Sequence, residues 1–164
     1  MKNVNVVIAG LGGQGVIKAS DILADAAFRA GFDVKKSELH GMSQRGGSVS
    51  SDVRFGAGIL SPMVPEGEAD ALVALDKDQV AVNRHMLRPG VAPLDPDSLG
   101  GAKLPDRKSL NVAMLGLLSA GLEDLPESAW HEALDAAFSG GAAAANREAF
   151  RTGRSIGEAI KEKT

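Results

Sequence analysis

Apolar residues near the start of the chain follow two spacings, and together these predict a β–turn–α–β unit. Residues 3–10, NVNVVIAG, form a β-branched apolar run typical of a strand buried on both faces. From Val16 to Ala30 apolar residues recur at helical spacing, and Gly31 follows where helices commonly end. Residues 32–38, FDVKKSE, predict a second strand. A unit of this kind should be right-handed.

The middle of the chain predicts two more strands and a helix. Residues 48–56, SVSSDVRFG, alternate with period two, which indicates a strand with one wetter face. Residues 61–70 hold two prolines and are predicted to be a loop, whereas 71–76, ALVALD, predict another buried strand. Residues 77–87 predict a helix, and a short strand is expected at 91–94.

The last third of the chain is predicted to be helical. An apolar stripe over 110–118 predicts the first helix of this part. Gly116 lies inside that helix, where glycine costs about 1 kcal/mol relative to alanine, so close packing against the sheet or a partner is expected. Asn111 shares the stripe and is predicted to be a hydrogen-bonded core amide, as is Asn146 farther along.

Two further helices are expected toward the C-terminal end. Asp124 and Glu127 have capping-box spacing and should begin a helix that runs through Phe138. Residues 142–153 predict another helix that ends at Gly153, and the charged segment after it is expected to fray. The sum is a three-layer α/β fold with a mainly parallel, Rossmann-like sheet, and residues 1–164 are expected to form one domain.

Composition narrows the possible functions. The net charge is −3, and the chain has no Tyr, one Trp and five Phe, which argues against nucleic-acid binding. It has no cysteine, which excludes disulfides, cysteine-ligated zinc, iron–sulfur clusters and thiol catalysis within this chain. The apolar N-terminal run is too short for a signal peptide, and no run approaches a membrane span. We therefore expect a cytoplasmic protein without a membrane partner.

A glycine-rich turn, GLGGQG, follows the first strand and precedes the first helix. Gly10, Gly12 and Gly15 have the spacing of the dinucleotide fingerprint, and Glu38 lies about 20 residues farther on, where a ribose-binding acid would stand. The other interpretation is that small residues simply let the helix cross the strand.

Two residues in the turn weaken the nucleotide interpretation. Gly13 makes the turn more open than the fingerprint requires, and Gln14 places a large polar side chain in it. Gln14 could bind a partner or ligand, or it could tie down the next loop. Gly10, Gly12, Gly13, Gln14 and Gly15 are the candidate cofactor-binding residues.

A second polar loop, HGMSQRGG, follows the second strand. Because it also lies at the carboxyl end of a strand, it is expected beside the glycine turn, where open α/β sheets bind ligands. Arginine offers a planar fork for an anion, and paired glycines allow close approach. His40, Gln44, Arg45, Gly46 and Gly47 are the candidate residues for a partner or a cleft; the alternative is a merely structural turn.

Neither a catalytic triad nor a metal site is indicated. Ser43 lies near His40, but no GxSxG elbow surrounds the serine. The other histidines, His85 and His131, are scattered and are expected to be solvated helix residues.

Three stretches together resemble a known family. GLGGQGVIKASDILADAAFRAG, SELHGMSQRGGSVSSDVRFG and GEADALVALD are similar to the gamma-type domain of the 2-oxoacid:ferredoxin oxidoreductases. The stretch HGMSQRGGSV most resembles the indolepyruvate type, in its beta subunit. The resemblance covers nearly the whole chain, and the spacing of the turn and the second loop makes it specific.

The resemblance implies oxidative decarboxylation of a 2-oxoacid, here an aryl pyruvate, to an acyl-CoA. It implies thiamine diphosphate, iron–sulfur clusters and coenzyme A in a complex with an alpha subunit, and electron transfer to ferredoxin. Because this chain lacks cysteine and a GDG-type thiamine diphosphate motif, it is expected to bind none of these cofactors alone, to hold no catalytic residue and to be inactive in isolation. Gln14, Gln44 and Arg45 are expected to face the partner or its CoA-bearing cleft.

Two other functions stay open from the sequence. The chain could be a stand-alone dinucleotide-binding protein that uses the glycine turn. It could also be a regulatory or assembly module that kept the fold without the enzyme.

Overall fold

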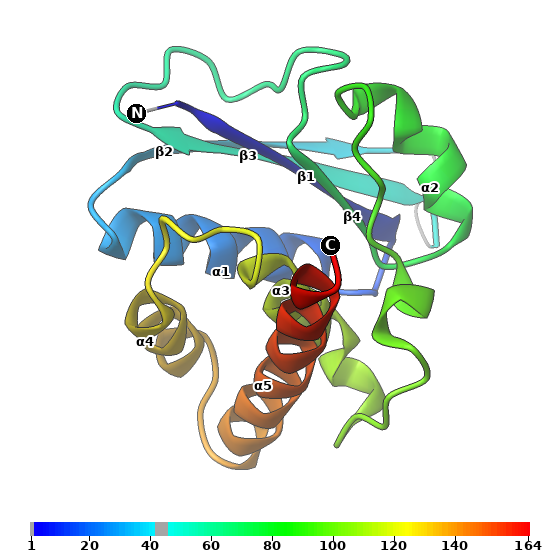
Figure 1. Cartoon of the computed structure of the whole chain (residues 1–164), viewed down its shortest axis with the longest axis vertical. Coiled ribbons are helices and arrows are strands. Elements are labelled where there is room, and N and C mark those ends of the chain that lie inside the picture. Colours follow the sequence, from blue (N-terminus) through cyan, green and yellow to red (C-terminus); the bar gives the residue numbers. More distant parts are fainter. Residues whose placement is uncertain (1, 42–45) are drawn as a thin grey trace.

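The structure is a computed structural model that describes residues 2–41 and 46–164. Its sheet is built from β1 (Val4–Leu11), β2 (Asp33–His40), β3 (Ser48–Gly56) and β4 (Ala71–Ala74). The strands lie in the order β2-β3-β1-β4, so β1 is internal and β2 is an edge strand. The α/β class predicted from the sequence is confirmed, and Figure 1 shows the sheet with its helices.

The sheet is mixed, and the prediction of a mainly parallel sheet was wrong. β4 runs parallel to β1, but β3 is antiparallel to both β1 and β2. The cause is the short connection between β2 and β3, because only antiparallel neighbours can be joined without a long crossover. β3 therefore inserts between the two strands of the expected β–α–β unit.

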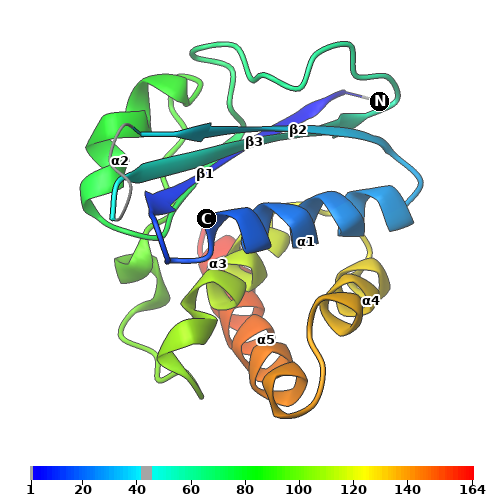
Figure 2. The same ribbon diagram turned by 180° about the vertical axis from the view of Figure 1, so that it is seen from behind.

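Helices cover one face of the sheet. α1 (Val16–Arg29) and α3 (Leu110–Ser119) lie nearer the strands, while α4 (Glu127–Ala137) packs against α1 and α5 (Gly141–Glu162) packs against α3 (Figures 1 and 2). The main core lies between the sheet and this layer. Its largest fully buried side chains include Ile8, Phe55, Met114, Trp130 and Phe150.

The opposite face of the sheet is covered by a loop and short helices and not by a layer of long helices (Figure 1). A smaller core containing Val7, Ala9 and Leu72 lies there beneath residues 57–70, which cross the sheet as a loop (Figure 1). Arg54 holds this loop by donating to the carbonyls of Ser61 and Met63.

Short helical segments complete this side of the fold. The helix predicted at 77–87 is confirmed as α2 (Asp78–Asn83) and the 3-10 turn η1 (Arg84–Met86). The predicted strand at 91–94 is reduced to one bridge between Leu94 and Val73. Two more 3-10 turns, η2 (Pro96–Leu99) and η3 (Arg107–Ser109), lead into α3.

Glycines set the contact between α3 and α5. A Cβ on Gly116 would overlap the carbonyl oxygen of Phe150, and one on Gly153 would overlap that of Ala113. Gly157 approaches the Leu117 carbonyl in the same way, at 2.7 Å from its hypothetical Cβ. Gly153 therefore lies within α5 as a packing residue, and the prediction that it ends the helix was wrong. The segment after it is helical to Glu162.

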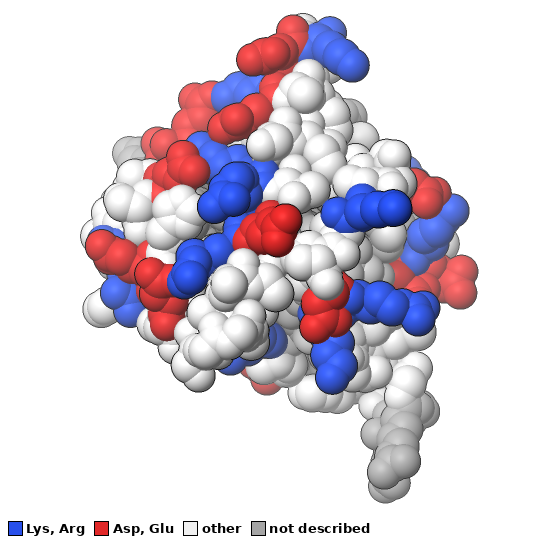
Figure 3. Space-filling model, turned by 90° about the horizontal axis from the view of Figure 1, so that it is seen from below, with Lys and Arg blue, Asp and Glu red and all other residues white. Residues whose placement is uncertain are grey.

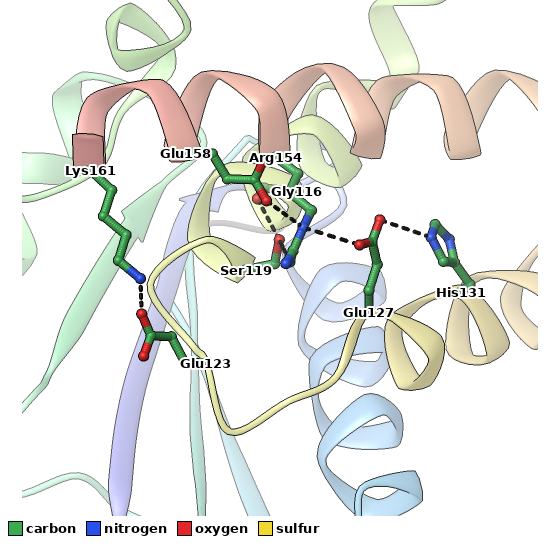
Figure 4. A network of polar contacts seen from close by, with 8 residues as sticks. All are labelled: Gly116, Ser119, Glu123, Glu127, His131, Arg154, Glu158 and Lys161. Carbon is green, nitrogen blue, oxygen red and sulfur yellow. Dashed lines mark hydrogen bonds and ion pairs between the residues drawn. The ribbon is translucent and has the colours of Figure 1, made fainter. Parts of the chain in front are cut away.

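Polar side chains join the end of α3 and the start of α4 to the C-terminal half of α5, as Figure 4 shows. Arg154 donates to Ser119 Oγ at 3.1 Å and pairs with Glu158 at 3.1 Å and with Glu127 at 3.7 Å. Glu127 also contacts His131 Nε2 at 3.3 Å. The predicted capping box of Asp124 and Glu127 is not formed. Glu127 is instead the first residue of α4, and Pro126 precedes the helix without a side-chain cap.

The surface of the helical layer carries both basic and acidic side chains (Figure 3). Figure 3 views the molecule from below, and basic and acidic side chains lie interspersed across that surface. Over the parts of the chain that the structure describes, no helix combines the length and apolarity needed to cross a membrane.

Candidate functional site: a cleft between two glycine loops

A cleft of about 390 Å³ opens where the glycine turn meets the tip of the β2–β3 hairpin. The turn follows β1, and the first residues of α1 form the floor beside it. The lining residues are Leu11, Gly12, Gly13, Gly15, Val16, Ile17, Lys18, His40, Gly41, Gly46, Gly47, Ser48 and Val49. The size falls in the range of pockets that hold small ligands or peptide segments.

The two glycine loops are bound to each other. The Gly12 amide donates to the Gly47 carbonyl at 2.9 Å. A Cβ on Gly12 would come within 3.3 Å of the Gly46 nitrogen, so the absence of a side chain allows the loops to approach. The prediction that both loops lie together at the carboxyl ends of strands is confirmed for Gly46 and Gly47.

Gln14 braces the turn from behind and does not line the cleft. Its Oε1 accepts from the Leu11 amide at 2.7 Å, and its Nε2 donates to Asp76 Oδ2 at 3.1 Å. Asp76 in turn accepts from the Asp78 amide at 3.0 Å. Both the oxygen and the nitrogen of the Gln14 side-chain amide are therefore hydrogen-bonded within the chain. This differs from the expectation that Gln14 faces a partner or ligand.

Asn111 holds the end of the turn from α3. Its Nδ2 donates to the Gly15 carbonyl at 3.2 Å, while its Oδ1 accepts from the Val112 amide at 2.9 Å. Gly15 has φ +85, and a Cβ there would lie 3.1 Å from Asn111 Cγ, so both conformation and space require glycine. The predicted core amide is confirmed, and its partner lies 96 residues away in sequence.

Lys18, a charged side chain among the described residues of the cleft, is already engaged. Lys18 Nζ donates to the Ala137 carbonyl at 3.0 Å and lies 4.9 Å from the centroid of the Phe138 ring. His40 is exposed at the rim. The described part of the cleft is therefore lined mainly by backbone and apolar groups, with its amine directed to α4.

The topology removes the geometry of a dinucleotide site. β3 separates β1 from β2, so Glu38 lies two strands from the glycine turn. Glu38 pairs instead with Lys36, which also contacts Asp21 at 2.6 Å. Burial opposes the charge of Lys36, but the hydrogen bonds that its Nζ donates to the Asp21 and Glu38 carboxylates prevail and raise its pKa. The Gly12 amide is also committed to Gly47 rather than free for a phosphate.

The remaining predicted residues divide into three groups. Those that line the cleft are Gly12, Gly13, Gly15, His40, Gly46 and Gly47. Gly10 lies outside the cleft, packed against Gln14, Val16 and Leu75. Gln44 and Arg45 lie outside the described residues.

Several cleft residues were missed from the sequence, namely Leu11, Val16, Ile17, Lys18, Ser48 and Val49. Ile17 and Val49 line the cleft but look like ordinary core positions of a helix and a strand. Only their position at the ends of those elements distinguishes them.

The donor set of this chain does not fit an iron–sulfur cluster or another bound metal ion. Iron–sulfur clusters need thiolates, and the chain has no cysteine. Within residues 2–41 and 46–164, no three His, Asp or Glu side chains gather closely enough to hold a metal ion.

The sequence and fold define the class of protein. The model of the pyruvate ferredoxin/flavodoxin oxidoreductase family matches residues 5–105, so the chain belongs to this family. The match includes both glycine loops, Gln14 and Asp76.

A curated relative narrows the comparison. The chain is 51% identical over 76 residues to the indolepyruvate oxidoreductase subunit IorB of Thermococcus kodakarensis. That match covers 46% of this chain and 38% of the relative, so the chain aligns with little more than a third of that protein's length.

Two solved structures share the fold over almost the whole chain. The 2-oxoglutarate:ferredoxin oxidoreductase from Magnetococcus marinus, with 2-oxoglutarate, coenzyme A and succinyl-CoA bound, gives a TM-score of 0.80 at 26% identity; the match covers 97% of this chain and 32% of that one. The gamma subunit of a keto/oxoacid ferredoxin oxidoreductase from Geobacter sulfurreducens gives 0.79 at 22% identity, covering 97% and 98%.

Proposed function

We propose that this chain is the gamma-type, cluster-free subunit of a 2-oxoacid:ferredoxin oxidoreductase of the indolepyruvate type. In this proposal residues 1–164 act as one domain that docks on a cytoplasmic alpha subunit. That subunit holds thiamine diphosphate and the iron–sulfur clusters, releases CO2 from an aryl pyruvate, transfers the acyl group to coenzyme A and passes the electrons to ferredoxin.

One observation carries the proposal: the two loops that resemble the indolepyruvate type are locked together around one cleft. The bond between Gly12 and Gly47 fixes their relative position, and Gln14 and Asn111 brace the turn from behind. A cleft preorganised in this way, yet lined largely by backbone and apolar groups, suits contact with a protein surface better than catalysis.

The Magnetococcus marinus structure supports the same division of labour. There the matching region is 32% of a longer chain, so a domain of this fold occurs beside further domains of one oxidoreductase polypeptide. The present chain has no cysteine and so cannot itself ligate a cluster, and in this proposal the clusters belong to the partner.

Reconstitution with the alpha subunit from the same genome tests the function. We expect neither purified chain alone to reduce ferredoxin or a redox dye, and the mixture to do so in the presence of coenzyme A and indolepyruvate. Pyruvate and 2-oxoglutarate serve as comparison substrates and should react more slowly. Activity of this chain alone, or a mixture no more active than the alpha subunit, would contradict the proposal. A nucleotide titration tests the dinucleotide alternative. Titration of this chain with NAD(H), NADP(H) and FAD should give neither heat nor a thermal shift, and binding of any of them would favour that alternative.

Arg45 provides a second prediction, which comes from the sequence. An arginine between the two cleft-lining ends of the hairpin loop is expected to meet an anion of the partner or of coenzyme A. Arg45→Ala should lower the activity of the reconstituted complex by at least tenfold, whereas Arg45→Lys should retain part of it. The thermal midpoint of the free chain checks that folding is unchanged. Full activity with Arg45→Ala would remove this role.

A further inference from the structure

A second, smaller pocket lies on the other face of the same hairpin tip. It has a volume of about 200 Å³ and is shared between β2, β3 and α2. It adjoins the cleft, because both are lined by His40, Gly41, Ser48 and Val49. The residues that belong to this pocket alone are Leu39, Ser50, Gln79, Val82 and Asn83, and we refer to it as the Gln79 pocket.

Two large apolar side chains line the Gln79 pocket while remaining exposed. Leu39 on edge strand β2 is 72% exposed, and Val82 on α2 is 54% exposed. A single exposed aliphatic residue is ordinary on a protein surface. Two that line one pocket create an apolar rim that would gain free energy by being covered.

The pocket also contains a buried acceptor without a donor. Gln79 is only 6% exposed, and its Oε1 is buried with no hydrogen-bond partner among the described residues. The main chain of Gln79 is fixed at both polar atoms, since its amide donates to the Asp76 carbonyl at 3.0 Å and its carbonyl accepts from Asn83 Nδ2 at 2.9 Å. Buried polar atoms are nearly always paired in native proteins, so a docked group that brings a donor to this oxygen would remove an unfavourable unpaired atom.

We propose that the Gln79 pocket receives one aromatic anchor residue of the alpha subunit, a tryptophan or tyrosine whose N–H or O–H donates to Gln79 Oε1. The inference rests on the proposed function, because it names a contact of that same assembly. An aromatic side chain combines an apolar body for Leu39 and Val82 with a single polar donor, and such residues dominate the energetics of protein interfaces.

Size and position favour this occupant over others. Pockets for cofactors and drug-sized ligands span about 300–1,000 Å³, and this pocket is smaller. Its continuity with the cleft means that a protein docked in the cleft would also reach the opposite face of the hairpin tip. The alpha subunit would then contact both faces of the hairpin where β2 ends and β3 begins.

The test compares variants of the chain for binding to the purified alpha subunit by calorimetry. Leu39→Asp should weaken the Kd by at least tenfold without lowering the thermal midpoint of the free chain. Phe28→Asp is the matched control: Phe28 is 71% exposed but lies near the far end of α1, so its Kd should stay within twofold of the wild type.

Gln79→Met gives the sharper result, because it should stabilise the free chain and weaken its binding to the alpha subunit. Methionine fills a similar volume without an unpaired oxygen, so the free chain should gain thermal stability. The complex should nevertheless weaken by at least tenfold, because the partner's donor is then left unpaired. A role of Gln79 confined to the fold of this chain would not produce that combination.

The outcomes separate this inference from the proposed function. A wild type that binds the alpha subunit, with Leu39→Asp and Gln79→Met binding equally well, overturns the pocket and leaves the function intact. A wild type that does not bind overturns both. Self-association of the free chain that Leu39→Asp abolishes in sedimentation, without any effect on alpha-subunit binding, assigns the pocket to a second copy and also overturns the proposal.

Discussion

Gly153→Ala should lower the free energy of unfolding by about 3 kcal/mol, because the new methyl group has no room between α3 and α5. Its Cβ would overlap the Ala113 carbonyl oxygen and lie 3.0 Å from the Leu117 nitrogen. Both obstacles are backbone atoms of α3, so no side-chain rotation relieves the overlap, and the helices must separate. For a chain of this length the thermal midpoint should fall by roughly 6–12 °C.

Gly141→Ala in the same helix is the matched control. Gly141 is the first residue of α5, and a Cβ there would meet no atom within 4 Å. Alanine at such a position reduces the entropy of the unfolded chain, so stability should stay level or rise by about 0.5–1 kcal/mol. Calorimetry and urea unfolding measure both variants. Equal stability of the two would show that the helix contact is not set by glycine.

Gln14→Leu should cost about 2 kcal/mol, because it removes the acceptor of the Leu11 amide and the donor to Asp76 together. Gln14→Glu keeps the size and the acceptor but places a second carboxylate against Asp76 Oδ2. Like charges at this distance repel, so this variant should be destabilised at pH 7 by a similar amount.

The double variant Gln14→Glu/Asp76→Asn should recover most of that loss. An asparagine at this position could still accept from the Asp78 amide and would donate its N–H to the glutamate. Urea unfolding of the wild type, Gln14→Glu, Asp76→Asn and the double variant gives the coupling energy between positions 14 and 76. A double variant no more stable than Gln14→Glu alone would contradict the proposed brace.

Much of the fold could be predicted because local spacing reflects burial. The alternation over 48–56 predicted a strand with one wetter face, and in β3 the apolar side chains of Val53 and Phe55 lie in the core. The strand before the glycine turn and the helix after it were predicted for the same reason. The antiparallel direction of β3 relative to β2 could have been predicted from their short connection. The order of the strands could not be, because period two does not indicate which strands are neighbours in the sheet.

Glycines near the C-terminal end show the opposite case. Gly153 has the local signature of a helix stop, yet it lies inside α5 because α3 approaches it closely. Gly116 was expected to pack closely against another element, but the sequence did not show whether that element was the sheet or a partner. Only the packed structure identifies that neighbour as α5.

The sequence by itself determined the α/β class, the two glycine loops and their meeting at the strand ends, because these depend on residue type and local spacing. Tertiary structure decided how the polar groups are used. It turned Gln14 toward Asp76, joined Asn111 to Gly15 and inserted β3 between the expected nucleotide-binding strands. It also left Gln79 Oε1 without a donor among the residues that the structure describes. A hydrogen bond between residues far apart in sequence leaves no periodic trace, since it depends on where the folded chain brings two atoms together.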